Sequence, residues 1–195
     1  MIAFDGVACA RGGRTLFADL SFTVGAGDAL LISGPNGVGK SSLLRVAAGL
    51  LPPAAGRVTG AAQRGWLGEA HALDPELPLG RALGFWAAVD GVRMAAAQVG
   101  AQVRAALVEA GLDHLSDVPV RLLSTGQKRR AALVPMLVAR PPVWLLDEPA
   151  SGLDVAAVDR LGDIIARHRT GGGAVMIVSH QPVALGDARA LRLGA

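Results

Sequence analysis

Residues 34–41 have the types and the spacing needed to bind a polyphosphate. They read Gly-Pro-Asn-Gly-Val-Gly-Lys-Ser and match the pattern G-x-x-x-x-G-K-[ST], whose glycines let backbone N–H groups turn into one cavity. Lys40 would reach the terminal phosphates of a nucleoside triphosphate, and the Ser41 hydroxyl would ligate the Mg²⁺ that travels with it. Only Lys40 and Lys128 are lysines among the 19 basic residues, which argues against a glycine-rich turn that binds nothing. The candidate nucleotide-binding residues of this loop are Gly34, Pro35, Asn36, Gly37, Val38, Gly39, Lys40, Ser41 and Ser42.

Two carboxylates form the second candidate catalytic group. Asp147 and Glu148 follow the apolar run 143–146, so they stand at the tip of a predicted strand, where phosphate-loop proteins hold magnesium. We expect Asp147 to lie on the metal side and Glu148 to accept a proton from the attacking water, a general-base role worth about 10²–10⁴ in rate. The alternative is that both acids simply face solvent. It is less favoured because glutamate is rare in this chain, at positions 69, 76, 109 and 148 only.

The phosphate loop needs a strand before it and a helix after it. The run 29–33 is short and apolar, which predicts a strand, and 42–48 has helical spacing. A helix that begins near Lys40 directs the positive end of its dipole at the bound phosphates. We expect this helix to end at Gly49, a residue suited to a left-handed cap.

The order of the remaining elements predicts an α/β fold with an inserted helical lobe. The chain opens with strands, and from Glu69 to about Leu122 strands give way to helices that carry no chemical motif of their own. Afterwards apolar strands alternate with helices, which is typical of a largely parallel sheet covered on both faces. Besides 29–33, we expect strands at 2–10, 20–24, 56–58, 64–68, 143–146 and 174–178, and helices at 79–89, 94–110, 124–138 and 155–169, the last capped by Asp154.

Length, composition and charge narrow the class of protein. The 195 residues suit one domain, 1–195, with a helical subdomain at approximately 70–122. Although 51% of the residues are hydrophobic, no run of about eighteen lacks a charge, so we expect no membrane span. Residues 1–5 form neither a basic nor an apolar region, so we expect no signal peptide.

The net charge of +3 is mild, and the arginines are scattered except at 128–130, which does not indicate a nucleic-acid surface. The single cysteine, Cys9, excludes an internal disulfide and is expected in the core rather than as a nucleophile.

Further motifs resemble those of the ATP-binding subunits of ABC transporters. Residues 123–127, Leu-Ser-Thr-Gly-Gln, are similar to the signature sequence Leu-Ser-Gly-Gly-Gln of that family, with Thr125 in place of a glycine. Residues 151–154 resemble its D-loop, and His180 resembles its switch histidine. A lone histidine or a lone SxGQ would carry little weight. These motifs nevertheless occur in the family's order and spacing, together with the phosphate loop and the two carboxylates. The resemblance implies a P-loop NTPase of the ABC ATPase type, with ATP and Mg²⁺ as cofactors.

The signature sequence also implies a partner. Ser124 offers a hydroxyl, Gly126 permits close approach of the backbone, and a helix begins there with unpaired N–H groups, which makes a second phosphate cap. In this family the cap does not fold back on the phosphate loop of its own chain. The resemblance therefore implies a head-to-tail homodimer with two ATP molecules between the surfaces of Lys40 and Ser124. The expected ATP-binding residues of the cap are Ser124, Thr125, Gly126 and Gln127, and the expected catalytic residues are Glu148, His180 and Glu69.

Within this family the chain is most similar to the haem-exporter ATP-binding subunits of cytochrome c maturation systems. The likeness implies a peripheral ATPase on the cytoplasmic face of the bacterial inner membrane that binds integral membrane subunits and no nucleic acid. Phe85 and Trp86, with the loop 66–71, are candidates for contacting such a subunit; the alternative is that both rings fill the lobe's own core, Phe85 more so than Trp86. Whether ATP moves haem or releases a haem-loaded chaperone stays open. The likeness rests on 9–14, 16–17, 20–22, 66–68, 118–120, 127–130 and 180–182.

Besides Thr125, three further residues depart from the family pattern. Most members stack adenine on an aromatic residue of the first loop, whereas this chain offers Arg11, in a polar loop predicted at 10–14, whose guanidinium would stack less tightly. The alternative is that Arg11 is simply solvated. Glu69 stands where most members carry a glutamine that contacts magnesium and the attacking water. Pro135 falls inside the predicted helix 124–138, where it should kink the helix at a cost of about 3 kcal/mol.

Other functions remain open at this point. One is export of another small molecule, and one is a non-transport ABC ATPase acting on ribosomes or DNA. Such non-transport proteins usually carry two cassettes or long inserted arms, which this chain does not have. A small-molecule P-loop kinase would need an acceptor pocket and an arginine-rich lid. The signature at 123–127 argues against the kinase.

Overall fold

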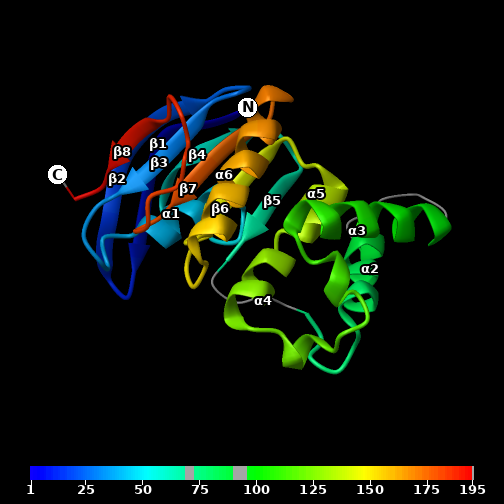
Figure 1. Ribbon diagram of the computed structural model, residues 1–195. Coiled ribbons are helices and arrows are strands. Elements are labelled where there is room, and N and C mark those ends of the chain that lie inside the picture. The colour runs from blue at the N-terminus through cyan, green and yellow to red at the C-terminus, as the bar shows by residue number, and fades with distance from the viewer. Residues whose placement is uncertain (69–72, 90–95, 195) are drawn as a thin grey trace.

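The computed structural model describes residues 1–68, 73–89 and 96–194, in which two sheets lie beside a group of helices (Figure 1). The antiparallel sheet has the strand order β2-β1-β4, and the parallel sheet has the order β5-β6-β7-β3-β8. The predicted α/β class is therefore confirmed. The strands are β1 Ile2–Arg11, β2 Arg14–Val24, β3 Ala29–Ser33, β4 Ala55–Gly60, β5 Arg64–Leu67, β6 Val143–Asp147, β7 Ala174–Val178 and β8 Arg189–Arg192. The helices are α1 Lys40–Ala47, α2 Leu79–Val89, α3 Ala96–Ala110, α4 Thr125–Ala131, α5 Val134–Ala139 and α6 Val155–Thr170, with 3₁₀ turns at Asp113–Leu115 and Val120–Leu122.

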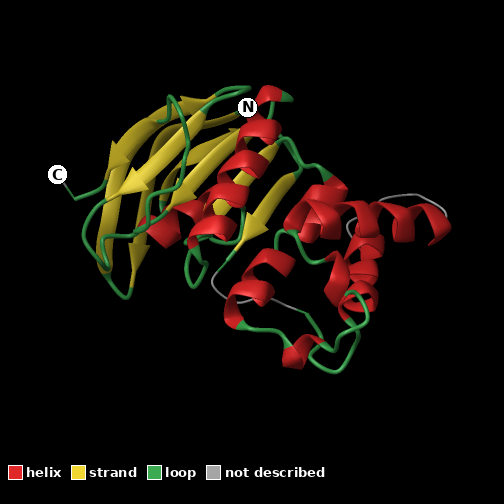
Figure 2. Ribbon diagram, viewed as in Figure 1, coloured by secondary structure: helices red, strands yellow, loops and turns green. Residues whose placement is uncertain are grey.

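The parallel sheet forms the centre of the molecule and is covered on both faces, as predicted. Every residue of β6 and β7 is buried, which fits their continuous apolar sequences. On one face α1 packs Leu43 and Leu44 into a core shared with the antiparallel sheet. On the other face α6, which crosses the sheet in Figure 2, packs Leu161 and Ile165. Because the strands are parallel, the loops that follow β3, β6 and β7 meet at one edge of the sheet.

The first two strands are longer than predicted and form a tight hairpin. Residues 10–14 were expected to be a polar loop, but the strands continue to Arg11 and from Arg14, and these two residues are cross-strand partners. Only Gly12 and Gly13 remain in the turn, with φ of 55° and 75°. Two positive φ values are what a two-residue type I′ hairpin turn requires, and a Gly-Gly pair adopts them without strain. Cys9 is 1% exposed in the core beside this hairpin, as expected.

Both predicted helix caps are present. Gly49, after α1, has a φ of 74°, and the N–H of the following Leu50 donates to the Arg45 carbonyl at 2.9 Å. At the start of α6 the Asp154 carboxylate accepts a hydrogen bond from the Ala157 N–H at 2.8 Å. The caps fix where the two helices that flank the sheet begin and end.

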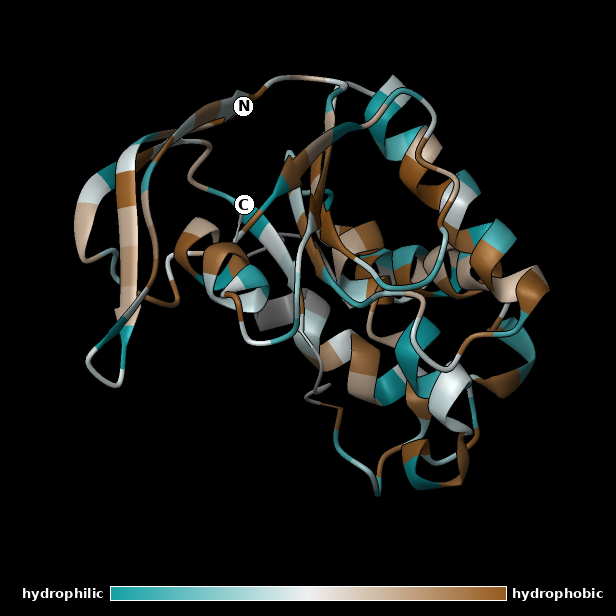
Figure 3. Cartoon of the chain, turned by 90° about the vertical axis from the view of Figure 1, so that its left-hand side faces the viewer, coloured by the Kyte–Doolittle hydropathy of each residue, from teal (hydrophilic) through white to brown (hydrophobic). Residues whose placement is uncertain are grey.

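The helical lobe has a core of its own. Its helix α3 buries the predicted apolar face, and α2 contributes Leu79 and Leu83. Val134 and Val138 of α5 pack into the same cluster, so helices beyond residue 122 help to close it. Figure 3 shows both hydrophobic and hydrophilic residues on the helices of the molecule, as expected of amphipathic helices. Within the described ranges, no helix is long and apolar enough to cross a membrane. The buried face of α3 consists of Val99, Val103, Ala106, Leu107 and Ala110.

The single helix expected at 124–138 is wrong. The chain forms two helices, α4 and α5, separated at Ala132 and Leu133. Pro135 lies in the first turn of α5, where its missing N–H would have had no intrahelical partner. The proline therefore begins a helix instead of kinking one, and the expected cost of about 3 kcal/mol does not arise.

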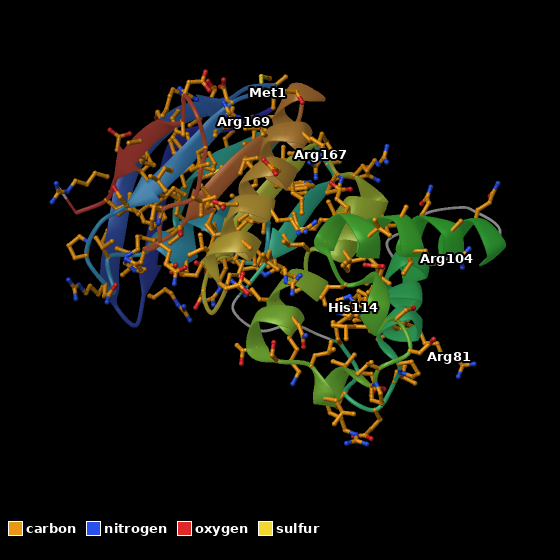
Figure 4. All side chains as sticks on the ribbon, in the orientation of Figure 1. Met1, Arg81, Arg104, His114, Arg167 and Arg169 are labelled. Atoms are coloured by element: carbon orange, nitrogen blue, oxygen red, sulfur yellow. The ribbon has the colours of Figure 1, made fainter. Side chains whose placement is uncertain are left out.

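Arginines on α6 tie the sheet to its surroundings. Figure 4 labels Arg167 and Arg169 on α6, and Arg81 and Arg104 on the helical lobe. The Arg169 guanidinium donates to the Gly27 carbonyl at 2.8 Å and contacts Asp187 at 2.6 Å. Since α6 is 16 residues long, these contacts fix the end of the helix farthest from the carboxylates.

Candidate active site

The phosphate loop joins β3 to α1, as the sequence predicts. Lys40 is 8% exposed, and its ammonium donates to the carbonyls of Gly34 at 2.8 Å and Pro35 at 3.0 Å. The side chain thus curls back along its own loop. Its charge is placed where phosphate groups would bind over the N-terminus of α1.

Two glycines of the loop are required by close contacts. Gly34 has a φ of 139°, and a Cβ at this position would lie 2.5 Å from the Leu193 carbonyl oxygen. Gly39 has a φ of 110°, and its Cβ would lie 3.0 Å from Leu16. The loop is therefore held between the segment that follows β8 and strand β2. A side chain at either glycine would strain the backbone and displace the loop.

Ser41 and Asp147 are brought together, although 106 residues separate them. The Ser41 hydroxyl donates to Asp147 Oδ1 at 3.1 Å, and Asp147 is 5% exposed. Burial raises the pKa of the Asp147 carboxyl, and the neighbouring Glu148 charge adds to this, while the hydrogen bond from Ser41 opposes it. The two oxygen donors fit a magnesium ion, which prefers oxygen ligands and takes its remaining ligands from water and substrate phosphates. Within the described residues, no group of three or more His, Cys, Asp and Glu side chains could hold a metal ion without such help.

Glu148 occupies an unusual backbone conformation at the tip of β6. Its φ is 51°, and a non-glycine residue in this region costs about 1–3 kcal/mol and persists only where the surrounding structure holds it. The Glu148 N–H donates to the Val178 carbonyl at 2.8 Å. Its carboxylate accepts a hydrogen bond from the His180 N–H at 3.0 Å, and His180 Nε2 lies 3.5 Å from Oε1. The two predicted catalytic residues are thus neighbours, and the His180 side chain is 61% exposed.

A cavity of about 990 Å³ joins these groups. It is lined by both carboxylates, by His180 and by most of the phosphate loop, so the structure gathers the predicted chemistry at one place. Arg11, at the tip of the first hairpin, also lines it, which fits its expected place beside the nucleotide. The predicted site residues that line the cavity are Arg11, Asn36, Gly37, Gly39, Lys40, Ser41, Ser42, Thr125, Asp147, Glu148 and His180.

The signature sequence lies at the start of α4. Ser124 caps this helix: its hydroxyl accepts from the Gln127 N–H at 3.2 Å, and its own N–H donates to the Gln127 side chain at 2.8 Å. A Cβ on Gly126 would lie 2.8 Å from the Gly152 carbonyl, so this glycine permits contact with the D-loop. Among these described residues only Thr125 lines the cavity, and Ser124, Gly126 and Gln127 do not. Glu69, the remaining predicted site residue, lies outside the described residues.

Sequence reasoning missed Arg129. This arginine of α4 is 6% exposed and donates to the backbone carbonyls of Gly68, Asp147 and Glu148. It was noted in the sequence only within the basic run 128–130 and within the family likeness at 127–130, and it was given no role in the site. No local pattern distinguishes it from its neighbours, because its acceptors lie 61, 18 and 19 residues away in the chain.

The chain is similar to known proteins over its whole length. A family model described as ABC transporter matches residues 17–151. The cytochrome c biogenesis ATP-binding export protein CcmA of Sphingopyxis alaskensis is 53% identical over 194 residues, covering 100% of this chain and 97% of that protein. The protein of the same name from Zymomonas mobilis subsp. mobilis is 49% identical, covering 98% of this chain and 84% of that protein. The dimeric structure of a post-hydrolysis state of the ATP-binding cassette MJ0796 bound to ADP and Pi has a similar fold, with a TM-score of 0.87 at 22% identity, covering 99% of this chain and 94% of that chain.

Proposed function

The chain belongs to the ABC transporter family, and from this membership we propose that it is the ATP-binding and ATP-hydrolysing subunit of an export complex that serves cytochrome c biogenesis. The observation that carries the proposal is the cavity in which the phosphate loop, both carboxylates and His180 meet. Relatives at 53% and 49% identity are named cytochrome c biogenesis ATP-binding export proteins, which supports the choice of process. We propose that the work done is export of haem or release of a haem-loaded chaperone.

ATP binding follows from the phosphate loop. The N–H groups of the loop and of the first turn of α1 bind the phosphates, and the Lys40 ammonium exchanges its contacts with Gly34 and Pro35 for phosphate oxygens. Ser41 and Asp147 would hold Mg²⁺, which neutralises charge on the phosphates when it is bound. The residues on both sides of the cavity thereby fix the terminal phosphate next to Glu148.

Hydrolysis requires a base beside the terminal phosphate. Glu148 accepts the proton of the attacking water, and His180 holds its carboxylate through the backbone N–H contact of 3.0 Å. The imidazole of His180 is exposed and lies beside the same carboxylate, with Nε2 3.5 Å from Oε1. The strained backbone of Glu148 places the carboxylate beyond the tip of β6 instead of along the strand.

The signature sequence supports a homodimer. Ser124, Gly126 and Gln127 do not line the cavity of their own chain, so we propose that they cap the ATP bound by a second copy. The ATP-binding cassette MJ0796, whose fold is similar, has a dimeric structure. In this arrangement Thr125 stands near the border between the two chains.

We propose that the membrane subunits bind the helical lobe of this single ATP-binding domain, on the cytoplasmic face of the inner membrane. Phe85 of α2 is 60% exposed, although of the two rings it was expected to fill the core more than Trp86. Trp86 instead packs partly into the lobe core and meets Phe85 edge-on, with ring centroids 5.7 Å apart. An exposed aromatic ring supported by a second ring is a suitable anchor for a partner helix.

Arg11 should contribute to nucleotide affinity through stacking. We expect Arg11→Ala to weaken ATP binding several-fold, because a guanidinium stacked on a ring contributes about 0.5–1 kcal/mol at an exposed site. Arg14 is the matched control, since it is the cross-strand partner of Arg11 and does not line the cavity. Fluorescence titration with a labelled ATP analogue measures the ATP affinity of both variants. Equal affinities for Arg11→Ala and Arg14→Ala would mean that Arg11 is merely solvated.

The proposed role in cytochrome c biogenesis is tested by deleting the gene in its host. We expect covalently attached haem in periplasmic c-type cytochromes to disappear, while a b-type cytochrome assayed in the same membranes is unchanged. A plasmid copy of the parent gene should restore the c-type signal, and one that encodes Glu148→Gln should not.

Two outcomes would contradict this account. Normal c-type cytochromes in the deletion strain would refute the assignment to cytochrome c biogenesis. The protein would then be an ABC ATPase with another cargo. Full restoration of c-type cytochromes by the Glu148→Gln gene would show that cytochrome c biogenesis does not depend on ATP hydrolysis at this site.

A further inference from the structure

We propose that Arg129 is a positioning residue that holds the backbone of the general base Glu148 and couples it to the helix of the signature sequence. The inference rests on the proposed role of Glu148. Arg129 belongs to α4, which packs with the helical lobe, whereas Glu148 follows β6 of the parallel sheet. The contact between them therefore bridges two parts of the molecule.

The guanidinium is buried among carbonyl oxygens at the tip of β6. Its Nε donates to the Glu148 carbonyl at 3.2 Å, and one terminal nitrogen donates to the carbonyls of both Glu148, at 2.6 Å, and Asp147. The other terminal nitrogen donates to the Gly68 carbonyl at 2.5 Å, where β5 has just ended. Two segments that are distant in sequence, the ends of β5 and of β6, thus converge on one side chain of α4.

These contacts complete the support of Glu148. The N–H of Glu148 is held by the Val178 carbonyl, and its C=O is held by Arg129. With both ends of the residue fixed, the positive φ of 51° is maintained and the carboxylate is directed into the cavity. Without the guanidinium the tip of β6 would be free to relax to an ordinary conformation, which would turn the carboxylate away.

The fork of the guanidinium is what makes the contact possible. Arginine presents N–H groups in one plane and in several directions, so a single side chain reaches the carbonyls of Gly68, Asp147 and Glu148. The lysine ammonium keeps the charge but has one nitrogen on a flexible stem. Arg129→Lys therefore retains the charge but loses the simultaneous hydrogen bonds to the three carbonyls.

The same contact relates the base to the signature sequence. Ser124 caps α4, and Arg129 lies little more than one helical turn later. A displacement of α4 relative to β6 must move the guanidinium against the carbonyls that it holds. We infer that Glu148 is correctly placed only while α4 is seated, so hydrolysis depends on the position of the signature helix.

The test compares adjacent arginines of one helix in the purified full chain. Arg129→Lys should lower kcat for ATP by about 10–100-fold and leave the Kd for ATP unchanged, because a catalytic group displaced by about 1 Å costs up to 10² in rate while the phosphate loop is intact. Arg130→Lys is the control, since Arg130 donates to the carbonyls of Ala110 and Gly111 within the lobe. It should leave kcat and Kd unchanged, even if the melting temperature falls.

A second variant separates positioning from stability. Arg129→Ala should be inactive and should regain activity when guanidinium ion is added below denaturing concentration, whereas Arg130→Ala should show no such gain. The proposal would be overturned if Arg129→Lys had the kcat of the parent protein. It would also be overturned if Arg129→Lys lost kcat, ATP affinity and melting temperature together and guanidinium ion did not restore the activity of Arg129→Ala. Glu148→Gln is assayed beside these variants: full activity in that variant would refute the base itself, whatever Arg129 does.

Discussion

Replacing Glu148 with glutamine should lower the rate of ATP hydrolysis by about 10²–10⁴-fold while ATP binding is retained. Glutamine has nearly the same shape, so it still accepts the hydrogen bond from the His180 N–H and leaves the tip of β6 in place. The amide cannot take a proton from water, so the loss falls on kcat and not on affinity. Phosphate release and equilibrium binding of a labelled ATP analogue measure the two quantities separately.

The control for this variant is a glutamate outside the site. Glu76 is exposed and forms a surface ion pair with Arg121 at 3.4 Å, so Glu76→Gln should hydrolyse ATP like the parent. If Glu148→Gln hydrolyses ATP at the parent rate, another residue is the general base and the assignment of Glu148 at the tip of β6 is wrong. A loss of ATP binding in Glu148→Gln would also contradict the assignment, since it would make Glu148 a ligand of the nucleotide.

Replacing Lys40 with alanine should weaken ATP binding by about 10–100-fold, since a hydrogen bond to a charged group contributes about 1.5–3 kcal/mol and each 1.4 kcal/mol is a factor of ten. The variant loses the ammonium that reaches the phosphates. It also loses the contacts of that ammonium with the carbonyls of Gly34 and Pro35. The Kd for ATP, measured by titration in the presence of Mg²⁺, reports the effect.

Lys128 provides a matched control because it is the other lysine of the chain. Its ammonium donates to the Arg121 carbonyl at 3.4 Å, and it does not line the cavity. Lys128→Ala should therefore bind ATP like the parent. If Lys40→Ala also binds like the parent, the loop does not bind phosphates through this side chain.

The sequence predicted the parts of the site that depend on local pattern. The phosphate loop, the acids after an apolar strand and the helix caps at Gly49 and Asp154 each occupy a short segment, and the structure has them where they were expected. Local patterns are informative because hydrogen bonding within a few residues determines them. Ser41 was expected to ligate Mg²⁺ and Asp147 to lie on the metal side, and the structure places the Ser41 hydroxyl 3.1 Å from Asp147 Oδ1.

Features that depend on distant contacts were not predicted. Strand β8 is polar and mostly exposed, so no apolar run marks it, and it exists because its backbone pairs with β3. Arg129 looked like its basic neighbours, and only the fold brings its acceptors together. The break between α4 and α5 was missed because the apolar spacing continues through it, while Pro135 was assigned to the middle of a helix instead of its first turn.

The strained backbone of Glu148 also escaped sequence analysis. Asp147 and Glu148 were expected to have different roles, but nothing in their residue types indicates that the backbone of Glu148 adopts a positive φ. Two distant segments hold this conformation, through Val178 and His180 at the end of β7 and through Arg129 of α4. The backbone conformation that places the Glu148 carboxylate is thus a property of the fold.

The claim that two copies of the chain complete each nucleotide site is tested most directly with the Glu148→Gln variant. Light scattering coupled to size exclusion, with quantification of bound nucleotide, gives the mass and the ATP content of the species formed in Mg²⁺ and ATP. The account predicts a particle with the mass of two chains and one ATP per chain, and a monomer when ATP is omitted. A particle that retains the mass of one chain while ATP is bound would contradict it.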